Sequence, residues 1–326
     1  MRALVCHDIS DDFSGVSIRD LPLPEPAPGE VRLRIKAASL NFPDLLLCQG
    51  KYQLKLDPPF IPGMDTAGKV DALGEGVTSF AVGDAVVAGM RFGGLSQYVC
   101  VPAEGLRKKP SNMTFAEAAS YQVAYLTAHV ALVRRGNLRA GETLLVHGAS
   151  GGVGMAALDM GKLLGARVIA TSGSDEKLER VRAQGADHVI STDGGFREEV
   201  KALTEGRGAD VIYDPVGGDV FDESTRCINF DGRLLVIGFT SGRIASISSN
   251  MPLIKGFSVV GVRAGEYGRR FPEKGEENLN TIWQWAEEGR TRPFIHGELP
   301  LSETLEGFRM LENRQVIGKL VIRPDC

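Results

Sequence analysis

Two patterns of apolar and polar residues divide the chain. Up to about residue 122, apolar and polar residues alternate in short runs between glycine- and proline-rich stretches, as expected for strands with one buried face. The clearest run is Val31–Ala37, and further short strands are expected at 67–70, 84–87 and 97–101. This part of the chain is therefore predicted to form a small β-barrel.

From about residue 123 the pattern changes to continuous apolar runs, with helix-like stretches between the early ones. The runs lie at 144–146, 168–170, 188–190, 211–213, 234–237 and 259–262. Strands buried on both faces that alternate with helices indicate βαβ units and a doubly wound parallel sheet. The last stretch predicts helices at 279–288 and 302–311, and a strand at 319–322 that returns to the first domain. The expected domains are 1–122 with 263–326, and 123–262.

The segment 143–154 carries the most specific signal in the second domain. An apolar strand ends at His147, a glycine turn follows, and a helix begins by Met155, which is the context of a dinucleotide-binding fingerprint. In such turns, glycines allow a tight bend, close approach of the backbone to a pyrophosphate, and (at Gly154) close packing of the helix on the strand. The helix N-terminus favours the phosphate charge. The candidate phosphate-binding residues are Gly148, Ala149, Ser150, Gly151, Gly152 and Val153.

The end of the next strand indicates which dinucleotide binds. Domains that bind NAD carry an Asp or Glu about 20 residues after the turn, and its carboxylate binds the ribose hydroxyls. Here the strand runs into Ser172 and Gly173, and no acidic residue stands at that position. Lys177 follows on the first helical turn, where its ammonium can meet a 2′-phosphate; the alternative is that it is a solvated surface residue. We therefore expect NADPH.

The same glycine turn permits a competing reading. Residues 148–152 also fit the G-x-S-x-G nucleophile elbow of hydrolases, which needs an acid and then a histidine later in the chain. Asp214 and His296 are the candidates for this acid and this histidine. This alternative does not explain Gly154 or the series of strands that follows, so the dinucleotide reading is preferred.

Composition and charge narrow the ligand classes. The chain of 326 residues is long enough for about two domains, and its net charge of −4, with no long basic block, argues against nucleic acid as the main ligand. No apolar run reaches the roughly 18 residues that a membrane span needs, and aspartates interrupt the N-terminal stretch where a signal peptide would be apolar. Five scattered cysteines without a C-x-x-C pair indicate free thiols in a cytoplasmic protein.

Taken together, the motifs resemble those of the medium-chain dehydrogenase/reductase superfamily, and within it the quinone oxidoreductase (zeta-crystallin-like) branch. They occur in family order along almost the whole chain: Pro28–Val31, Ile61–Gly68, Val82–Val86, Ala149–Gly154 and Asp214–Gly218. The resemblance implies an α/β protein in which a GroES-like, β-rich catalytic domain is split around a Rossmann domain. It also implies a homodimer or homotetramer.

The chain departs from the zinc-dependent members of that superfamily. Where they carry a G-H-E turn with a histidine ligand, this chain reads Gly63-Met64-Asp65. The position of an earlier cysteine ligand matches Asn41, and the third ligand position falls near Val123. Asparagine, methionine and valine do not form a catalytic zinc site, so no metal is expected. The protein must then activate its substrate by hydrogen bonds or a proton donor.

The resemblance also implies roles for single residues. Tyr52 matches a tyrosine near the nicotinamide that is proposed as a proton donor in enoyl thioester reductases, and its alternative role is packing on the cofactor. Asn41 is expected to bond the nicotinamide amide or the substrate carbonyl, so Tyr52 and Asn41 are the candidate catalytic residues. The remaining cofactor contacts that the resemblance implies are Thr127, Thr192, Val216, Gly238, Phe239 and Thr240. Arg314, near the C-terminus, is a further candidate contact to the 2′-phosphate, and a surface role for it is equally open.

The leading hypothesis is a zinc-independent NADPH-dependent reductase that passes hydride to a quinone or an α,β-unsaturated carbonyl. An enoyl-CoA reductase of the same fold is the enzymatic alternative. A third possibility, from a different class, is an NADPH-binding protein with a crystallin-like or RNA-binding role and no significant turnover. The expected partner is a small-molecule substrate, with no membrane and no primary nucleic acid ligand.

Overall fold

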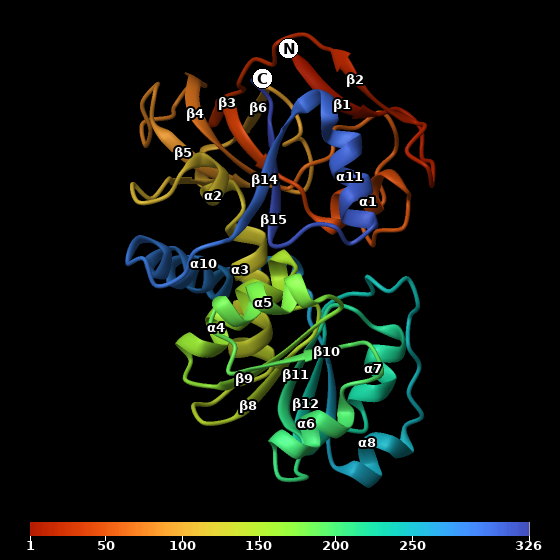
Figure 1. Cartoon of the computed structure of the whole chain (residues 1–326). Coiled ribbons are helices and arrows are strands. Elements are labelled where there is room, and N and C mark those ends of the chain that lie inside the picture. Colours follow the sequence, from red (N-terminus) through yellow and green to blue (C-terminus); the bar gives the residue numbers. More distant parts are fainter. Residues whose placement is uncertain (326) are drawn as a thin grey trace. The chain divides into compact units, whose positions relative to one another are not determined.

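The computed structural model describes residues 1–325 and divides the chain into two compact units (Figure 1). Unit 1 comprises residues 1–123 and 292–326, and unit 2 comprises residues 124–291. The first boundary falls one residue after the expected one. The second does not lie at 262/263, because residues 263–291 belong to unit 2 and not to the first domain.

Two helices carry that correction. Helices α9 (Ala264–Arg270) and α10 (Pro272–Glu287) pack on each other, and α9 also packs against the π-helix η2 (Val130–Arg135). The Arg134 side chain of η2 donates hydrogen bonds to Asn278 and Glu277 of α10, and both distances are 2.7 Å. Asn278 is fully buried, so this contact ties α10 to unit 2. No pattern between 263 and 278 signalled it.

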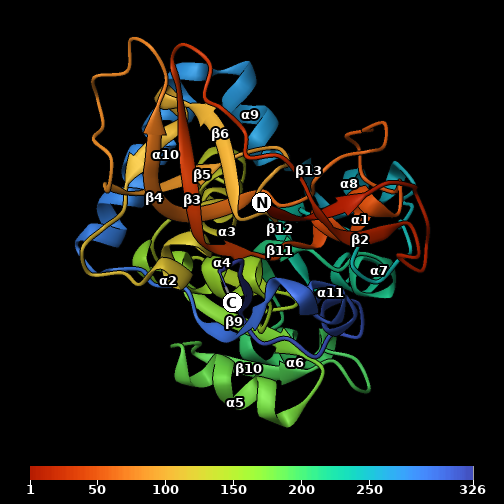
Figure 2. The same cartoon turned by 90° about the horizontal axis from the view of Figure 1, so that it is seen from above.

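Unit 1 is built on antiparallel strands. Its main sheet has the order β14-β15-β3-β4-β5-β7, with β6 also paired to β3, and β1 and β2 form a separate pair; Figure 2 shows β3 to β6 together. The alternation predicted for Val31–Ala37 is present in β3, where Val31, Leu33 and Ile35 are fully buried. The strands are β1 (Arg2–Cys6), β2 (Val16–Asp20), β3 (Glu30–Ser39), β4 (Asp65–Leu73), β5 (Ala85–Gly89), β6 (Tyr98–Pro102), β7 (Leu106–Lys108), β14 (Ile295–Pro300) and β15 (Lys319–Arg323).

The C-terminal segment completes this sheet, as the sequence predicted. Strand β15 pairs antiparallel with β3 and parallel with β14. The helical elements of unit 1 are short: α1 (Phe42–Cys48), η1 (Ala103–Gly105), α2 (Phe115–Ala119), η3 (Leu301–Glu303) and α11 (Thr304–Glu312). Helix α3 (Gln122–His129) contains the boundary between the units.

Unit 2 is a parallel six-stranded sheet with the order β10-β9-β8-β11-β12-β13. All five strand pairs are parallel, and the order reverses between β8 and β11, as in doubly wound dinucleotide-binding folds. The strands are β8 (Thr143–Val146), β9 (Arg167–Ser172), β10 (His188–Ser191), β11 (Ala209–Asp214), β12 (Ile228–Val236) and β13 (Ser258–Gly261). Each contains or overlaps one of the six predicted apolar runs.

Helices cover both faces of this sheet. Helices α4 (Gly152–Leu163) and α5 (Asp175–Ala183) lie on one face, and α6 (Arg197–Leu203), α7 (Gly218–Ser224) and α8 (Asn250–Lys255) on the other (Figure 1). On the second face, strand residues Leu145, Ile169 and Ile212 pack with Phe196 and Phe221. The carboxyl ends of β8 and β11 therefore meet at the reversal of strand order, where ligands bind in open α/β sheets.

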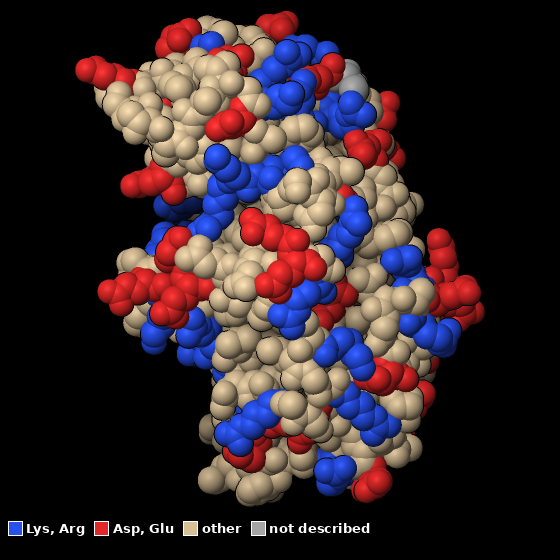
Figure 3. Space-filling model, turned by 90° about the vertical axis from the view of Figure 1, so that its left-hand side faces the viewer, with Lys and Arg blue, Asp and Glu red and all other residues tan. Residues whose placement is uncertain are grey.

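Charged side chains of both signs are interspersed on the face drawn in Figure 3. This agrees with the near-neutral composition and does not form the broad basic surface that nucleic acid binding favours. Among the described residues, no helix is both long enough and apolar enough to cross a membrane.

Candidate functional site

The glycine turn after β8 has the geometry that its sequence predicts. Gly148 adopts a φ of 55°, which side-chain-bearing residues rarely take, and its carbonyl accepts a hydrogen bond from Gly151 N–H at 3.0 Å. A Cβ atom on Gly154 would lie 2.3 Å from the Gly148 carbonyl oxygen. The expectation that Gly154 allows close packing is therefore confirmed, since any side chain there would push helix and turn apart.

Helix α4 begins directly at this turn. Gly151 is its N-cap and supplies no side-chain cap, while Gly152 and Val153 form the first turn. The first N–H groups of a helix have no partner within it, and they carry a partial positive charge. A cradle of glycines in front of uncapped N–H groups suits a pyrophosphate.

Hydroxyl groups line the neighbouring strand ends. The Ser150 and Ser172 hydroxyls are hydrogen bonded to each other at 3.0 Å, and Thr192 N–H donates to the Ser172 carbonyl. A Cβ on Gly173 would lie 3.5 Å from Thr192 Oγ1. The structure thus brings Ser150, Ser172, Gly173 and Thr192 together at the ends of β8, β9 and β10. Lys177 stands half-buried on the first turn of α5, after the exposed Asp175 and Glu176.

The loops after β11 and β12 form the other side of the turn. The Asp214 carboxylate accepts hydrogen bonds from Val216 N–H (2.8 Å) and Gly217 N–H (2.9 Å). The N–H and the hydroxyl of Thr240 both donate hydrogen bonds to the Pro215 carbonyl, and both distances are 3.1 Å. These bonds hold the second loop on the first.

The same loops reach the glycine turn and each other. A Cβ on Gly148 would lie 3.3 Å from Val216, one on Gly217 would lie 3.1 Å from the Phe239 ring, and one on Gly238 would lie 3.2 Å from the Pro215 carbonyl oxygen. The predicted residues Gly148, Val216, Gly238, Phe239 and Thr240 are therefore contiguous. Phe239 is 37% exposed.

The other predicted residues lie elsewhere. Thr127 is half-buried on α3, in unit 2. Arg314 is exposed in unit 1, with a φ of 57°, just after the end of α11, a position where left-handed residues commonly end helices. Asn41 and Tyr52, also in unit 1, lie at opposite ends of α1.

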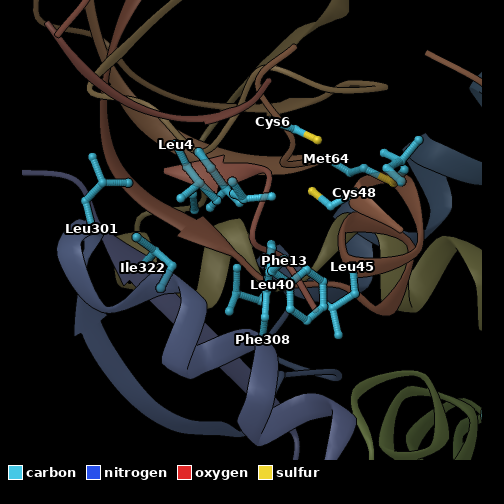
Figure 4. Packing of buried hydrophobic residues seen from close by; sticks show 14 of the residues in the cluster. Leu4, Cys6, Phe13, Leu40, Leu45, Cys48, Met64, Leu301, Phe308 and Ile322 are labelled. Carbon is cyan, nitrogen blue, oxygen red and sulfur yellow. The ribbon is translucent and has the colours of Figure 1, made fainter. Parts of the chain in front are cut away.

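Tyr52 follows the C-terminal end of α1 and is half-buried. Its N–H donates to the Leu46 carbonyl at 3.1 Å, and its side chain packs against the main core of unit 1. Figure 4 shows this core, in which Leu45 and Cys48 of α1 lie among the buried residues. The Cys6 and Cys48 thiols are hydrogen bonded to each other, and burial raises the pKa of both. Within residues 1–325, Cys6, Cys48, Cys100 and Cys227 are all free thiols, as expected, whereas Cys326 lies outside the described residues.

Asn41, at the N-terminal end of α1, is part of a buried charged network. Its amide Nδ2 donates to Asp65 Oδ2 (3.1 Å) and to the Ser39 carbonyl (3.3 Å), and its Oδ1 accepts from Lys319 Nζ at 2.6 Å. The ammonium can only donate, which fixes the amide with its oxygen toward Lys319. Both amide N–H groups are thereby used, and Asn41 retains only acceptor capacity on Oδ1.

Two carboxylates share this environment with one ammonium. Asp44 accepts hydrogen bonds from Asn41 N–H (2.8 Å) and Gly63 N–H (3.1 Å). Burial raises the pKa of Asp44 to about 7 and that of Asp65 to about 6, although the nearby Lys319 charge opposes both shifts. Burial also lowers the pKa of Lys319, against the pull of the two carboxylates. We name Asn41, Asp44, Asp65 and Lys319 the buried charged network.

A zinc ion does not fit this place. The positions of the zinc ligands are taken by Asn41, whose amide is already hydrogen bonded, and by Met64 and Val123. A thioether, a valine side chain and a committed amide are not a ligand set for Zn²⁺. Among the described residues, no group of three or more His, Cys, Asp or Glu side chains is arranged to hold a metal.

The hydrolase alternative loses its support in the structure. The nucleophile of an elbow sits on a strained turn, whereas Ser150 has no positive φ and its hydroxyl is paired with Ser172. The Asp214 carboxylate is occupied by two backbone N–H groups, and His296 Nδ1 accepts from Ile317 N–H. The three residues therefore hold local structure.

Sequence reasoning missed the partners of two predicted residues. Nothing in the pattern of β15 distinguished Lys319 from a surface lysine, yet it is 5% exposed. The spacing of Asn41 and Asp44 fits a helix-capping pair and could have suggested that contact. His147 was noted only for its place before the glycine turn, and its side-chain partners come from residues far along the chain.

The fold and the turn define a class: a medium-chain dehydrogenase/reductase with a GroES-like unit and a Rossmann unit. Family models agree, since residues 27–111 match the alcohol dehydrogenase GroES-like domain and residues 152–282 match the zinc-binding dehydrogenase domain. The second description contrasts with the absence of a zinc ligand set among residues 1–325.

Within that class, the chain belongs to the zinc-independent quinone oxidoreductase-like family. It is 35% identical to the quinone oxidoreductase-like protein 2 homolog of Nematostella vectensis, over 98% of this chain and 88% of that protein. The Escherichia coli quinone oxidoreductase complexed with NADPH superposes with a TM-score of 0.91 at 26% identity, covering 99% of this chain and all of the other. The CurK enoyl reductase superposes with a TM-score of 0.89 at 25% identity, covering 99% of both chains. The protein is therefore an oxidoreductase that uses a nicotinamide cofactor.

Proposed function

We propose that the protein is a zinc-independent, NADPH-dependent reductase of quinones or α,β-unsaturated carbonyl compounds. The observation that carries the proposal is the glycine turn before α4, together with the hydroxyl-lined strand ends beside it. No carboxylate stands at the end of β9, where Ser172 and Gly173 replace the acid that favours NAD. The E. coli quinone oxidoreductase, whose structure is complexed with NADPH, supports the same choice.

Different residues would bind different parts of this cofactor. The N–H groups of Gly152 and Val153 would bind the pyrophosphate, with the backbone of Ala149 and Gly151 beside them. Ser172, Gly173, Thr192 and Lys177 would face the 2′-phosphate, with Arg314 as a further cation for it. Val216, Gly238, Phe239 and Thr240 would line the nicotinamide end, and Thr127 would reach its ribose. When bound, the nicotinamide supplies a hydride.

The protein's own chemistry is then hydrogen bonding and proton delivery. Acceptors conjugated to a carbonyl need no Lewis acid, because the carbonyl already activates the carbon that receives hydride. Tyr52 is the candidate proton donor, since its phenol is the one titratable hydroxyl among the predicted catalytic residues. Both side-chain N–H groups of Asn41 already donate hydrogen bonds within unit 1. We therefore assign Asn41 the role of an acceptor toward the nicotinamide amide, and not that of a donor toward the substrate carbonyl.

An acceptor panel tests the substrate class. NADPH oxidation would be followed with naphthoquinone, phenanthrenequinone, simple enones and crotonyl-CoA. Quinones or enones are expected to support turnover, and a marked preference for crotonyl-CoA would favour the enoyl-CoA reductase alternative. NADPH binding without oxidation by any acceptor would favour the non-enzymatic alternative and reject the proposal.

The exposed edge of the parallel sheet suggests the oligomer. Strand β13 ends the sheet and is largely exposed, and beside it several large apolar side chains are open to solvent: Phe230 (77%), Leu253 (81%) and Ile254 (71%). An unpaired edge flanked by apolar residues is suited to pairing with a second copy. We propose a homodimer through β13. Light scattering should give twice the chain mass, and Val259→Pro should shift it to the monomer.

A further inference from the structure

His147 joins three elements beneath the glycine turn. It is fully buried on the face of β8 that also carries Leu145. Its Nδ1 lies 2.9 Å from Thr171 Oγ1 of β9, and its Nε2 lies 2.8 Å from Ser224 Oγ of α7. Its ring packs on Phe196, at the start of α6, with centroids 4.6 Å apart. Every polar atom of the side chain thus has a partner.

The hydrogen-bond partners determine the tautomer. Ser224 Oγ lies 2.7 Å from the Val220 carbonyl oxygen, which can only accept, so the single Ser224 proton is used there. Ser224 must then accept from His147, which places the ring proton on Nε2. Nδ1 carries the lone pair and accepts from the Thr171 hydroxyl. Burial lowers the pKa of His147 to about 3, so the ring is neutral at physiological pH.

This network ends on both sides of the candidate cofactor site. Thr171 precedes Ser172, and its carbonyl accepts a hydrogen bond from Ala149 N–H of the glycine turn at 3.0 Å. Ser224 lies on α7, which begins at Gly218, directly after the loop that contacts Gly148. The His147 backbone N–H donates to the Tyr213 carbonyl at the end of β11. The residue just before the turn is therefore tied to β9, to β11 and to α7.

We propose that His147 is a positioning residue for the cofactor. Locked in its Nε2–H tautomer, it sets the spacing between the glycine turn, the end of β9 and α7 before the dinucleotide arrives. The inference rests on the proposed function, since it assigns the turn to NADPH. It predicts that breaking the network weakens NADPH binding more than the same change in a comparable buried bond elsewhere in unit 2.

Paired threonine variants test this most cleanly. Thr171→Val removes the donor to Nδ1 and keeps the shape and the Thr171 carbonyl. Thr204→Val is the matched control, because Thr204 is equally buried and its hydroxyl bonds the Val200 carbonyl and Gly208 N–H, at the opposite end of the strands. Fluorescence titration should show the NADPH Kd raised about tenfold for Thr171→Val, and within twofold of the unmodified protein for Thr204→Val.

Further variants and a spectrum complete the test. His147→Leu should weaken NADPH at least as much as Thr171→Val, and His147→Gln, which can still donate to Ser224, should lie between His147→Leu and the unmodified protein. Nitrogen-15 NMR of the unmodified protein, without cofactor, should show His147 in the Nε2–H form from pH 5 to 9. An Nδ1–H form or an imidazolium, or equal Kd values for Thr171→Val and Thr204→Val, would overturn the proposal.

NADPH binding by the unmodified protein distinguishes the failure of the proposed function from the failure of the His147 role. If the unmodified protein bound neither NADPH nor NADH, the proposed function and the positioning role would both be rejected. If it bound NADPH but the two threonine variants bound equally well, only the role of His147 would be rejected.

Discussion

Each unit of the molecule buries a hydrogen-bonded side chain beside its candidate site residues, and the two networks differ in charge. In unit 2 the network around His147 is neutral and joins the glycine turn to hydroxyl groups. In unit 1 the buried charged network sets one ammonium, Lys319, beside Asp44 and Asp65, with Asn41 between them. The neutral network has no ionised group of its own, so the negative charge at this site would come from an anionic ligand. The charged network already contains its own cation, Lys319, which is hydrogen bonded to Asn41, the residue at one of the expected zinc-ligand positions.

The difference has a physical consequence. A neutral buried network costs little desolvation and keeps its geometry across a wide pH range. A buried ion cluster costs much more, and it is stable only while each charge keeps its partner. Substitutions in unit 1 should therefore act mainly on stability and its pH dependence, and those in unit 2 mainly on cofactor binding.

Removing the ammonium gives the largest expected effect. Lys319→Met leaves the two carboxylates and the Asn41 carbonyl oxygen without their cation, and it should lower the free energy of unfolding by about 3–5 kcal/mol. Urea unfolding measures this loss. Adding Asp65→Asn to Lys319→Met should restore part of it. A loss below about 1 kcal/mol, comparable to an exposed ion pair, would contradict a buried charged network.

The pH dependence of stability gives the next effect. Because the pKa of Asp65 rises from 3.8 to about 6 on folding, the folded state binds this proton more tightly. The stabilisation is complete below about pH 4 and is lost as the pH rises through 6. Between pH 4 and 8 the unmodified protein should lose more unfolding free energy than Asp65→Asn, by at most about 3 kcal/mol. Asp44, whose pKa burial raises to about 7, titrates in both proteins, so parallel profiles in urea would reject the assignment.

Close packing in the glycine turn gives a third, smaller effect. Gly154→Ala would place its Cβ against the Gly148 carbonyl, so the turn must shift. We expect a loss of about 1–3 kcal/mol in stability and at least a tenfold rise in the NADPH Kd. Gly105→Ala is the control, since a Cβ there meets nothing within 4 Å. Similar cofactor affinity in both variants would show that the turn does not hold the phosphates.

The smallest effect concerns the edge of the unit 2 site. Lys177→Ala should raise the Kd for NADPH about five- to tenfold, because a charge-assisted bond to the 2′-phosphate is lost, and leave that for NADH unchanged. Isothermal titration calorimetry with both cofactors measures the ratio of the Kd for NADPH to that for NADH. Lys162→Ala serves as the control, since Lys162 is paired with Asp187 instead. An equal change for NADPH and NADH would remove Lys177 from the 2′-phosphate.

Local sequence patterns predicted most of the fold. Six apolar runs gave six parallel strands, and Gly148 and Gly154 have the roles that a strand-turn-helix motif requires. What the patterns could not give were contacts between distant segments. Lys319 meets Asn41 across 278 positions of sequence, and His147 meets Ser224 across 77. The same limit explains the misplaced boundary at 262, because Arg134 holds α10 in unit 2 through long-range hydrogen bonds to Asn278 and Glu277.

The most direct test of the account is reductase activity in protein freed of metal. Protein treated with a strong chelator, and shown by elemental analysis to hold almost no zinc, would be mixed with NADPH and phenanthrenequinone. We predict unchanged NADPH oxidation, and a clear preference for NADPH over NADH. Activity that disappears with the metal and returns with one zinc per chain would contradict the central claim, as would no oxidation with any quinone or enone.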